Sequence, residues 1–229
     1  MAKTIIVGGF GPGISSAVAE KFGAEGFAVA LVARNAERLA EGVKALTAKG
    51  IKAAAFPADL GVPAAIKTMI GQVRAALGPI SALHWNAYSG GGAGDLLTAD
   101  VAAVNNVFDV AVVGLLTAVQ ESLADLKPAK GAILVTNGGL LFNDPNIDDV
   151  SAKRGLMGLA LGNAAKHKLV GLLAQRLKAD EVYVGEVIVT GTVKGSAFDN
   201  GSNATLEGPA IAQKFWDLYT SRTEMVVKV

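Results

Sequence analysis

The chain has 229 residues, a formal net charge of +1, 51% hydrophobic and 18% charged residues, and no cysteine. This length suits one domain with a sizeable core, and the lack of cysteine excludes disulfides and thiolate chemistry. The sequence contains no block of basic residues of the kind that indicates nucleic-acid binding. The strongest uncharged apolar run, 110–119, is shorter than the roughly 18–20 residues that span a bilayer, and the apolar run after Lys3 is too short for a signal peptide. We therefore expect a cytoplasmic protein that binds neither nucleic acid nor a membrane.

Short apolar strands alternate with amphipathic helices along the chain. Gly26 and Gly50 stop two of the helices, Pro63 lies near the start of another, and Thr98 or Asp100 could cap the longest one. The segment 137–149 is polar and is expected to be irregular. In chain order we predict strand 4–7, helix 14–25, strand 27–32, helix 37–49, strand 52–56, helix 63–77, strand 80–85, helix 101–126, strand 131–136, helix 151–178, strand 182–189, helix 211–219 and strand 225–229.

Strands separated by helices of about 12 residues or more indicate right-handed crossovers and a parallel sheet. The pattern therefore predicts an α/β fold of the Rossmann type, a doubly wound and mainly parallel seven-stranded sheet with helices on both faces. No linker or internal repeat divides the chain, so residues 1–229 are expected to form a single nucleotide-binding domain.

The segment GGFGPGIS, residues 8–15, lies between the first strand and the first helix. Glycine allows the backbone to turn tightly and to approach a diphosphate closely, while the helix start offers unpaired N–H groups and a positive dipole end. Because strand, glycine loop and helix occur in the required order, the segment predicts a dinucleotide site. The expected contacts are Gly9, Gly11, Gly13 and Ile14.

At this point the chain resembles the short-chain dehydrogenase/reductase family over nearly its whole length. The family's opening pattern, a threonine–glycine pair followed by GxxxGxG spacing, is matched by Gly9 and Gly13. Gly8 stands in place of the threonine, and Ser15 stands in place of the last glycine. Ser15 either packs less closely against the sheet or adds a hydroxyl near the phosphates.

Further matches concern the nucleotide. The second strand ends at Ala33, where NAD-preferring relatives have an acidic residue, and Arg34 follows, where NADP-preferring relatives place an arginine. A guanidinium can pair with a 2′-phosphate in a bidentate manner, so the resemblance implies NADP(H) rather than NAD. No second basic residue lies within the glycine turn itself.

Two more pairs complete the expected cofactor site. Asp59 and Leu60 resemble the family's pair beside the adenine ring, and Asn86 and Ala87 resemble its Asn-Ala-Gly motif along the cofactor. Tyr88 takes the place of that motif's glycine.

The family's catalytic residues are not matched. Its chemistry uses a tyrosine whose pKa is lowered by a lysine four residues later, together with a serine and a helix asparagine. One register places the tyrosine at Leu159 and the lysine at Asn163, and the other uses Asp149 and Lys153. In both registers the phenol is missing. The serine position falls on Asn137 or Gly138, the helix asparagine on Ala111, and the Pro-Gly after the sixth strand on Thr190-Gly191.

Other groups near this region are Tyr88, Lys166, Lys168, His167 and Asp144, for each of which an exposed surface position is the simpler interpretation. His84 and Trp85 lie in an apolar strand and are expected in the core. No catalytic residue is assigned.

Three functions remain open. The first is an oxidoreductase that transfers hydride to or from a small carbonyl or alcohol substrate at a non-standard site. The second is a catalytically inactive NADP-binding sensor or scaffold, and the third is a structural subunit that binds no nucleotide.

Two features concern assembly and access to the site. The helices at 101–126 and 156–177 resemble the family's main dimer interface, so a homodimer or homotetramer is expected. The segment 195–209 is expected to be mobile over the substrate cleft. The first of these helices carries more apolar residues than one face needs to pack on its own sheet. These residues are Val104, Val112, Leu115, Leu116 and Val119.

Overall fold

Seven parallel strands form the central sheet of the computed structural model, which describes residues 3–229. Their order is β3-β2-β1-β4-β5-β6-β9, and every neighbouring pair is parallel. The predicted Rossmann-type, doubly wound seven-stranded sheet is therefore confirmed. The strands are β1 Lys3–Gly8, β2 Phe27–Ala33, β3 Ala53–Pro57, β4 Ile80–Trp85, β5 Ala132–Gly138, β6 Tyr183–Val189 and β9 Val226–Lys228.

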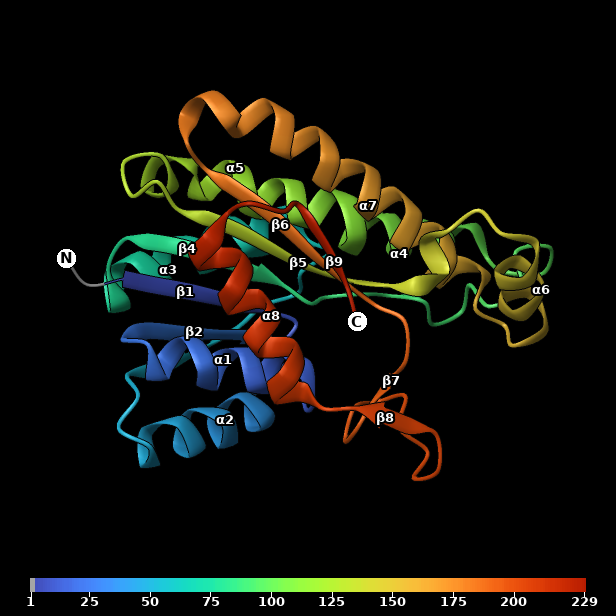
Figure 1. The fold of residues 1–229 in the computed structure, drawn as a ribbon, viewed down its shortest axis with the longest axis horizontal. Coiled ribbons are helices and arrows are strands. Elements are labelled where there is room, and N and C mark those ends of the chain that lie inside the picture. Colours follow the sequence, from blue (N-terminus) through green and yellow to red (C-terminus); the bar gives the residue numbers. More distant parts are fainter. Residues whose placement is uncertain (1–2) are drawn as a thin grey trace.

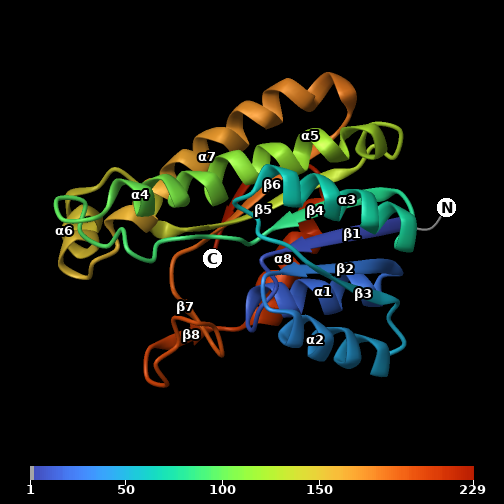
Figure 2. The same cartoon turned by 180° about the vertical axis from the view of Figure 1, so that it is seen from behind.

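Helices cover both faces of the sheet (Figures 1 and 2). Because successive side chains of a strand point to opposite faces, Ile6 joins one core cluster while Ile5 and Val7 join the other. One face carries α1 Ile14–Ala24, α2 Ala36–Ala48 and α8 Gly208–Ser221; the other carries α3 Pro63–Leu77, α4 Val101–Phe108, α5 Leu115–Leu126 and α7 Met157–Leu177.

The strand order reverses between β1 and β4. The chain runs outward from β1 to β3 and then returns to place β4 on the other side of β1. Ligands of open α/β sheets bind outside the carboxyl ends of the strands at such a reversal. The segments around α6 (Pro145–Lys153) and β7–β8 project from this end of the sheet, opposite the end where the chain enters β1 (Figure 1).

The helix predicted at 151–178 is wrong in its extent, because two helices occupy the region. Helix α6 begins inside the segment expected to be irregular, where the Asp144 carboxylate accepts a hydrogen bond from the Asn146 N–H group at 2.8 Å. The chain breaks between α6 and α7 at Gly155, whose φ is +63°. An aspartate cap before a proline and a glycine with positive φ are the local causes.

The predicted helix 101–126 is continuous but changes its winding at a π-helical turn, Asp109–Gly114. Asp100 caps it through the Ala102 N–H group. A Cβ built on Gly114 would lie 1.9 Å from the Leu60 carbonyl oxygen, so the glycine permits close backbone packing there. By length and composition the helix could cross a membrane, with a mean hydropathy of 1.7, but α5 packs on β4 and α3 here.

Two expectations about individual segments need revision. Leu115 and Val119 are fully buried in the core, so they are not surplus apolar residues for an interface. The segment 195–209 contains part of a small parallel sheet that the sequence did not predict, formed by β7 Thr192–Val193 and β8 Ala204–Leu206. Short 3₁₀ turns occur at Gly139–Leu141 and Lys178–Asp180.

Candidate functional site

The glycine-rich segment forms a tight turn between β1 and α1. Gly9 has a φ of +79°, and a Cβ built there would lie 2.5 Å from the Ala87 backbone nitrogen. Gly13 has a φ of +88°, and its Cβ would lie 3.2 Å from that of Ser196. Conformation and close approach therefore both require glycine at these two positions.

Ser15 closes the turn from the inside. Its side chain is fully buried, and its Oγ accepts a hydrogen bond from the Gly11 N–H group at 2.9 Å. The hydroxyl also lies within 3.1 Å of the Gly9 and Gly11 carbonyl oxygens, to one of which it can donate. Ser15 therefore determines the shape of the turn, and the Gly11 N–H group is used within the turn.

Helix α1 begins at Ile14 without a side-chain cap. Its N-cap residue is Gly13, which has no side chain to bond the first N–H groups, and no acidic residue lies in the first turn. The first N–H groups of a helix lack intrahelical partners, and the dipole there is positive. The residues present thus fit an anion such as a diphosphate.

Two arginines flank this turn. Arg34 follows the last residue of β2 and is exposed, and Arg38 lies in the first turn of α2. The Arg38 Nη1 atom lies 4.0 Å from the Cβ position of Gly11, and within residues 3–229 neither arginine forms an ion pair. Arg38 was not predicted as a site residue, because the family pattern pointed only to Arg34 just after the end of β2. The N-cap Asn35, whose Oδ1 accepts from the Arg38 N–H group at 2.8 Å, was the available signal.

The other predicted cofactor residues lie at the same edge of the sheet. Asp59 follows β3, and its Oδ1 accepts a hydrogen bond from the Gly61 N–H group at 2.9 Å. Leu60 is buried with its Cδ1 3.5 Å from the Cβ position of Gly8. The Asn86 Nδ2 atom lies 3.5 Å from the Gly9 carbonyl oxygen. The structure thus brings Leu60, Asn86 and Ala87 next to the turn.

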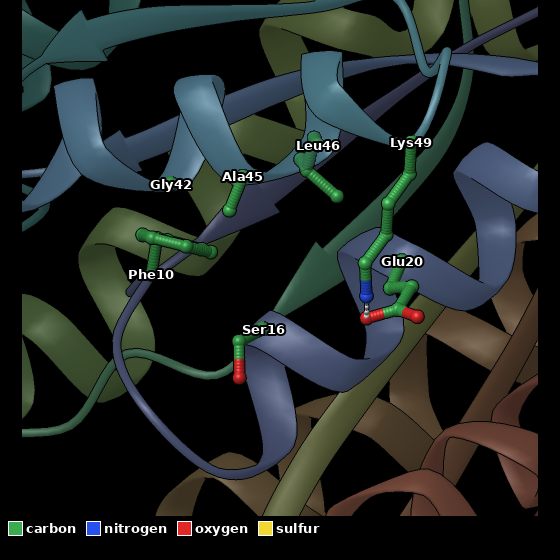
Figure 3. Close-up of a pocket in the computed structure, with 7 residues that line it drawn as sticks. All are labelled: Phe10, Ser16, Glu20, Gly42, Ala45, Leu46 and Lys49. Atoms are coloured by element: carbon green, nitrogen blue, oxygen red, sulfur yellow. Dashed lines mark ion pairs between the residues drawn. The ribbon is translucent and has the colours of Figure 1, made fainter.

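A small cavity of about 80 Å³ lies between α1 and α2, with the Phe10 ring at one side (Figure 3). Gly42 makes room for that ring, since a Cβ there would lie 2.5 Å from it. Lys49 and Glu20 form an ion pair of 2.6 Å at the other side. The cavity is too small for a dinucleotide, and we assign it no ligand.

The two catalytic registers fall on different helices of the structure, α7 and α6. A Cβ built on Gly138, at the end of β5, would lie 2.7 Å from the Asn163 Nδ2 atom of α7. One turn earlier, the Leu159 Cβ lies 3.4 Å from the Cβ position of Gly90. Gly138 and Asn163, two residues that the register of Leu159 and Asn163 uses, are therefore in contact.

The residues of the alternative register lie on a different helix. Asp149 and Lys153 lie on α6, where both are exposed and pair with each other at 2.8 Å. Ala111 lies in the π-helical turn beside α7, 3.6 Å from the Cβ position of Gly162. The residues that the first register uses, Gly138, Leu159, Asn163 and Ala111, thus lie on β5, on α7 and in the π-helical turn beside α7.

A buried polar cluster lies beneath this region. Glu186 of β6 is fully buried, and its carboxylate accepts hydrogen bonds from Asn137 Nδ2 at 2.7 Å and from His167 Nδ1 at 2.5 Å. Asn137 Nδ2 also donates to the Asn163 carbonyl oxygen at 2.9 Å. Burial lowers the pKa of the Lys166 ammonium to about 8, although the nearby Glu186 carboxylate raises it in part. We call Glu186, Asn137, His167 and Lys166 the β6 cluster.

His84 and Trp85 are core residues, as predicted. The His84 Nε2 atom lies 3.0 Å from Thr136 Oγ1, its ring packs on Phe215, and burial with a smaller effect of the Lys166 charge lowers its pKa to about 3. Tyr88 is half-exposed, its ring centroid lies 5.4 Å from that of Phe198, and burial raises the pKa of its phenol. Lys168 is exposed on α7.

The family model described as short chain dehydrogenase matches residues 3–204. The chain belongs to the short chain dehydrogenase family. Among curated relatives, a Streptomyces violaceoruber protein named as a ketoacyl reductase of the granaticin polyketide synthase is 31% identical over 172 residues, which cover 73% of this chain and 58% of that protein. The 2,3-dihydro-2,3-dihydroxybenzoate dehydrogenase of Bacillus subtilis is 37% identical over 81 residues, 35% of this chain and 31% of that enzyme. The alignments thus span less than two thirds of these relatives.

The short chain dehydrogenase fold is also clear from solved structures. A short chain dehydrogenase from Burkholderia cenocepacia in complex with NADP has a TM-score of 0.84 at 23% identity, covering 99% of this chain and 96% of that one. At this level of identity the similarity establishes the fold alone.

Proposed function

We propose that this short chain dehydrogenase is an NADP(H)-dependent oxidoreductase acting on a small carbonyl or alcohol substrate at a non-standard site. The uncapped N-terminus of α1 behind the turn of Gly9 and Gly13 carries the proposal. Its N–H groups suit the diphosphate, while Arg34 and Arg38 suit a 2′-phosphate that no carboxylate at Ala33 would repel. The NADP complex of the B. cenocepacia relative supports this choice of cofactor.

The bound cofactor would supply the hydride, and the chain would supply position and electrostatics. Asn86 and Ala87 lie against the glycine turn, and Gly138 and Asn163 lie at the end of the neighbouring strand. A substrate placed along these strand ends would meet a carboxamide and apolar side chains. The site is therefore non-standard in its proton chemistry.

Fluorescence titration with NADPH and with NADH tests the proposal directly. We expect saturable binding of both, with NADPH binding more tightly because of its additional phosphate. A protein that binds neither nucleotide would refute the function, and a protein that prefers NADH would refute the cofactor assignment.

A second candidate is an NADP-binding sensor or scaffold without catalysis. The observation that favours it is the set of residues at the catalytic positions, namely Leu159, Asn163 and Gly138, none of which is an acid or a base. A panel of carbonyl substrates with NADPH separates the two, because a sensor binds the nucleotide without any turnover.

The protein is further proposed to form a homodimer or homotetramer through α5 and α7. Val113, Leu161 and Leu172 are exposed by 40%, 40% and 57%, and only 33% of the most apolar part of the 101–126 helix is buried. A second copy would cover this apolar surface with closed symmetry. Light scattering that shows a monomer at micromolar concentration would contradict the assembly.

A further inference from the structure

The carboxamide of Asn163 packs against the backbone of Gly138. Asn163 is 5% exposed, and its side-chain nitrogen occupies the space that any larger residue at position 138 would need. The hydrogen bond from Asn137 goes to the backbone carbonyl of Asn163, so the carboxamide takes no part in it. A backbone hydrogen bond thus holds Asn163 in place, and no hydrogen bond within residues 3–229 engages its carboxamide.

The side chains at two further positions of this register, Leu159 and Ala111, are apolar. Leu159 lies one turn earlier on α7 and contacts Gly90, and Ala111 lies beside the helix at Gly162. An amide N–H group donates hydrogen bonds but does not release its proton at neutral pH. Such a donor stabilises negative charge that develops on a substrate oxygen without protonating that oxygen.

Two kinds of carbonyl acceptor differ in what they require from a site. Hydride addition to the carbonyl carbon of a simple ketone gives an alkoxide, which is about as basic as the conjugate base of water, with its pKa of about 15.7. Hydride addition to the β-carbon of an α,β-unsaturated carbonyl compound gives an enolate, delocalised like the anion of a phenol with a pKa of about 10. The enolate requires a hydrogen-bond donor and can take its proton from water.

We infer that the site reduces the carbon–carbon double bond of α,β-unsaturated carbonyl compounds, with Asn163 donating a hydrogen bond to the carbonyl oxygen. This inference rests on the proposed NADP(H)-dependent activity. The hydride forms a C–H bond at the β-carbon, the electron pair of the double bond shifts toward the carbonyl, and the oxygen becomes the enolate oxygen. Water then protonates the α-carbon. The balanced reaction consumes the enone, NADPH and one proton and yields the saturated ketone and NADP⁺.

The position of reduction tests the inference. With 2-cyclohexen-1-one and NADPH, gas chromatography should show cyclohexanone, and cyclohexanone itself should not be reduced further. Formation of 2-cyclohexen-1-ol would overturn the inference, and so would the absence of any product from protein that binds NADPH. Failure to bind NADPH is a separate result, which refutes the proposed function instead.

A spectroscopic measurement tests Asn163 without turnover. In the complex with NADP⁺, 4-nitrophenol serves as an enolate mimic whose absorbance separates phenol from phenolate. The wild-type protein should shift the bound probe toward phenolate, Asn163→Ala should lose the shift, and Asn163→Asp should reverse it. Gln175→Glu introduces the same charge change at an exposed position of α7 and should leave the shift intact. A probe that responds equally to Asn163→Asp and Gln175→Glu would overturn the role of Asn163.

The same variants are then compared in turnover. Asn163→Ala should lower kcat for the enone about 10²-fold, the usual effect of removing one oxyanion donor, while the NADPH dissociation constant stays within twofold. Tyr88 and Lys166 are the groups that could instead supply a proton. Tyr88→Phe and Lys166→Met should still yield cyclohexanone, and loss of that product in either folded variant would overturn the inference.

Discussion

Asn137 connects the end of β5 to the buried carboxylate of Glu186 through a hydrogen bond of 2.7 Å. The same side-chain nitrogen reaches the Asn163 carbonyl oxygen, and Asn137 Oδ1 accepts from the Gly138 N–H group at 3.0 Å. One carboxamide thus joins β5, β6 and α7 at the point where the substrate is proposed to bind.

Removing the carboxylate should destabilise the fold. Glu186→Ala leaves the buried Asn137 amide and the partly exposed His167 ring without their shared acceptor and should lower the free energy of unfolding by about 3 kcal/mol. Urea denaturation measures the loss. Glu186→Gln keeps an acceptor oxygen for Asn137 and should lose less, so equal losses for the two variants would contradict the role of the β6 cluster.

The arginines beside the turn should determine nucleotide preference. Arg34→Ala and Arg38→Ala should each weaken NADPH binding about tenfold or more and change NADH binding little, because a charge-assisted hydrogen bond contributes roughly 1.5–3 kcal/mol. Fluorescence titration gives both dissociation constants. Arg176→Ala removes an exposed arginine of α7 and serves as the control. If a variant weakens NADPH and NADH equally, its arginine does not contact the 2′-phosphate.

The turn should tolerate no side chain at Gly9. Gly26 also has positive φ, +87°, but a Cβ there would meet nothing within 4 Å. Gly26→Ala should therefore cost about 1–2 kcal/mol for backbone strain alone. Gly9→Ala adds a clash with Ala87 and should cost about 1–3 kcal/mol more. Thermal unfolding of the two variants isolates the clash, and similar midpoints would show that the backbone at Ala87 moves freely.

Buried His84 should make the protein sensitive to acid. Its pKa is lowered from 6.5 to about 3 in the folded state, so below pH 6.5 the unfolded chain binds a proton that the folded chain does not. Stability contributed by the neutral imidazole is present above pH 6.5 and declines as pH falls toward 3, by at most about 1.4 kcal/mol per pH unit. In urea denaturation His84→Gln, which cannot titrate, should show a shallower decline in this window. Parallel wild-type and variant profiles would contradict the assignment.

Local signals predicted most of the fold. Glycines at helix ends, Pro63 at the start of α3 and the apolar strands gave bounds within two residues for most elements. The break between α6 and α7 was missed because the apolar pattern alone favoured one helix, although Gly155 lies at the break. Strands β7 and β8 are only two and three residues long, too short for any periodicity to indicate them.

The candidate site was predictable only in part. Its glycine turn is local in sequence, and so the turn was found, whereas the contact of Gly138 with Asn163 joins residues 25 positions apart and needed the structure. Glu186 is the one charged residue in an otherwise apolar strand, and this pattern predicts a buried carboxylate. Its partners could not be known from the sequence, because Asn137 and His167 come from a different strand and a helix.

The buried hydroxyl of Ser15 forms hydrogen bonds with the backbone of the glycine turn. These bonds hold the loop in its shape without a ligand. The loop is therefore preorganised for a nucleotide. Because binding does not have to order a flexible loop, less conformational entropy is lost on association. The Gly11 amide should consequently be strongly protected from hydrogen exchange in the unliganded protein. A loop that becomes ordered only when phosphate binds would not show this protection.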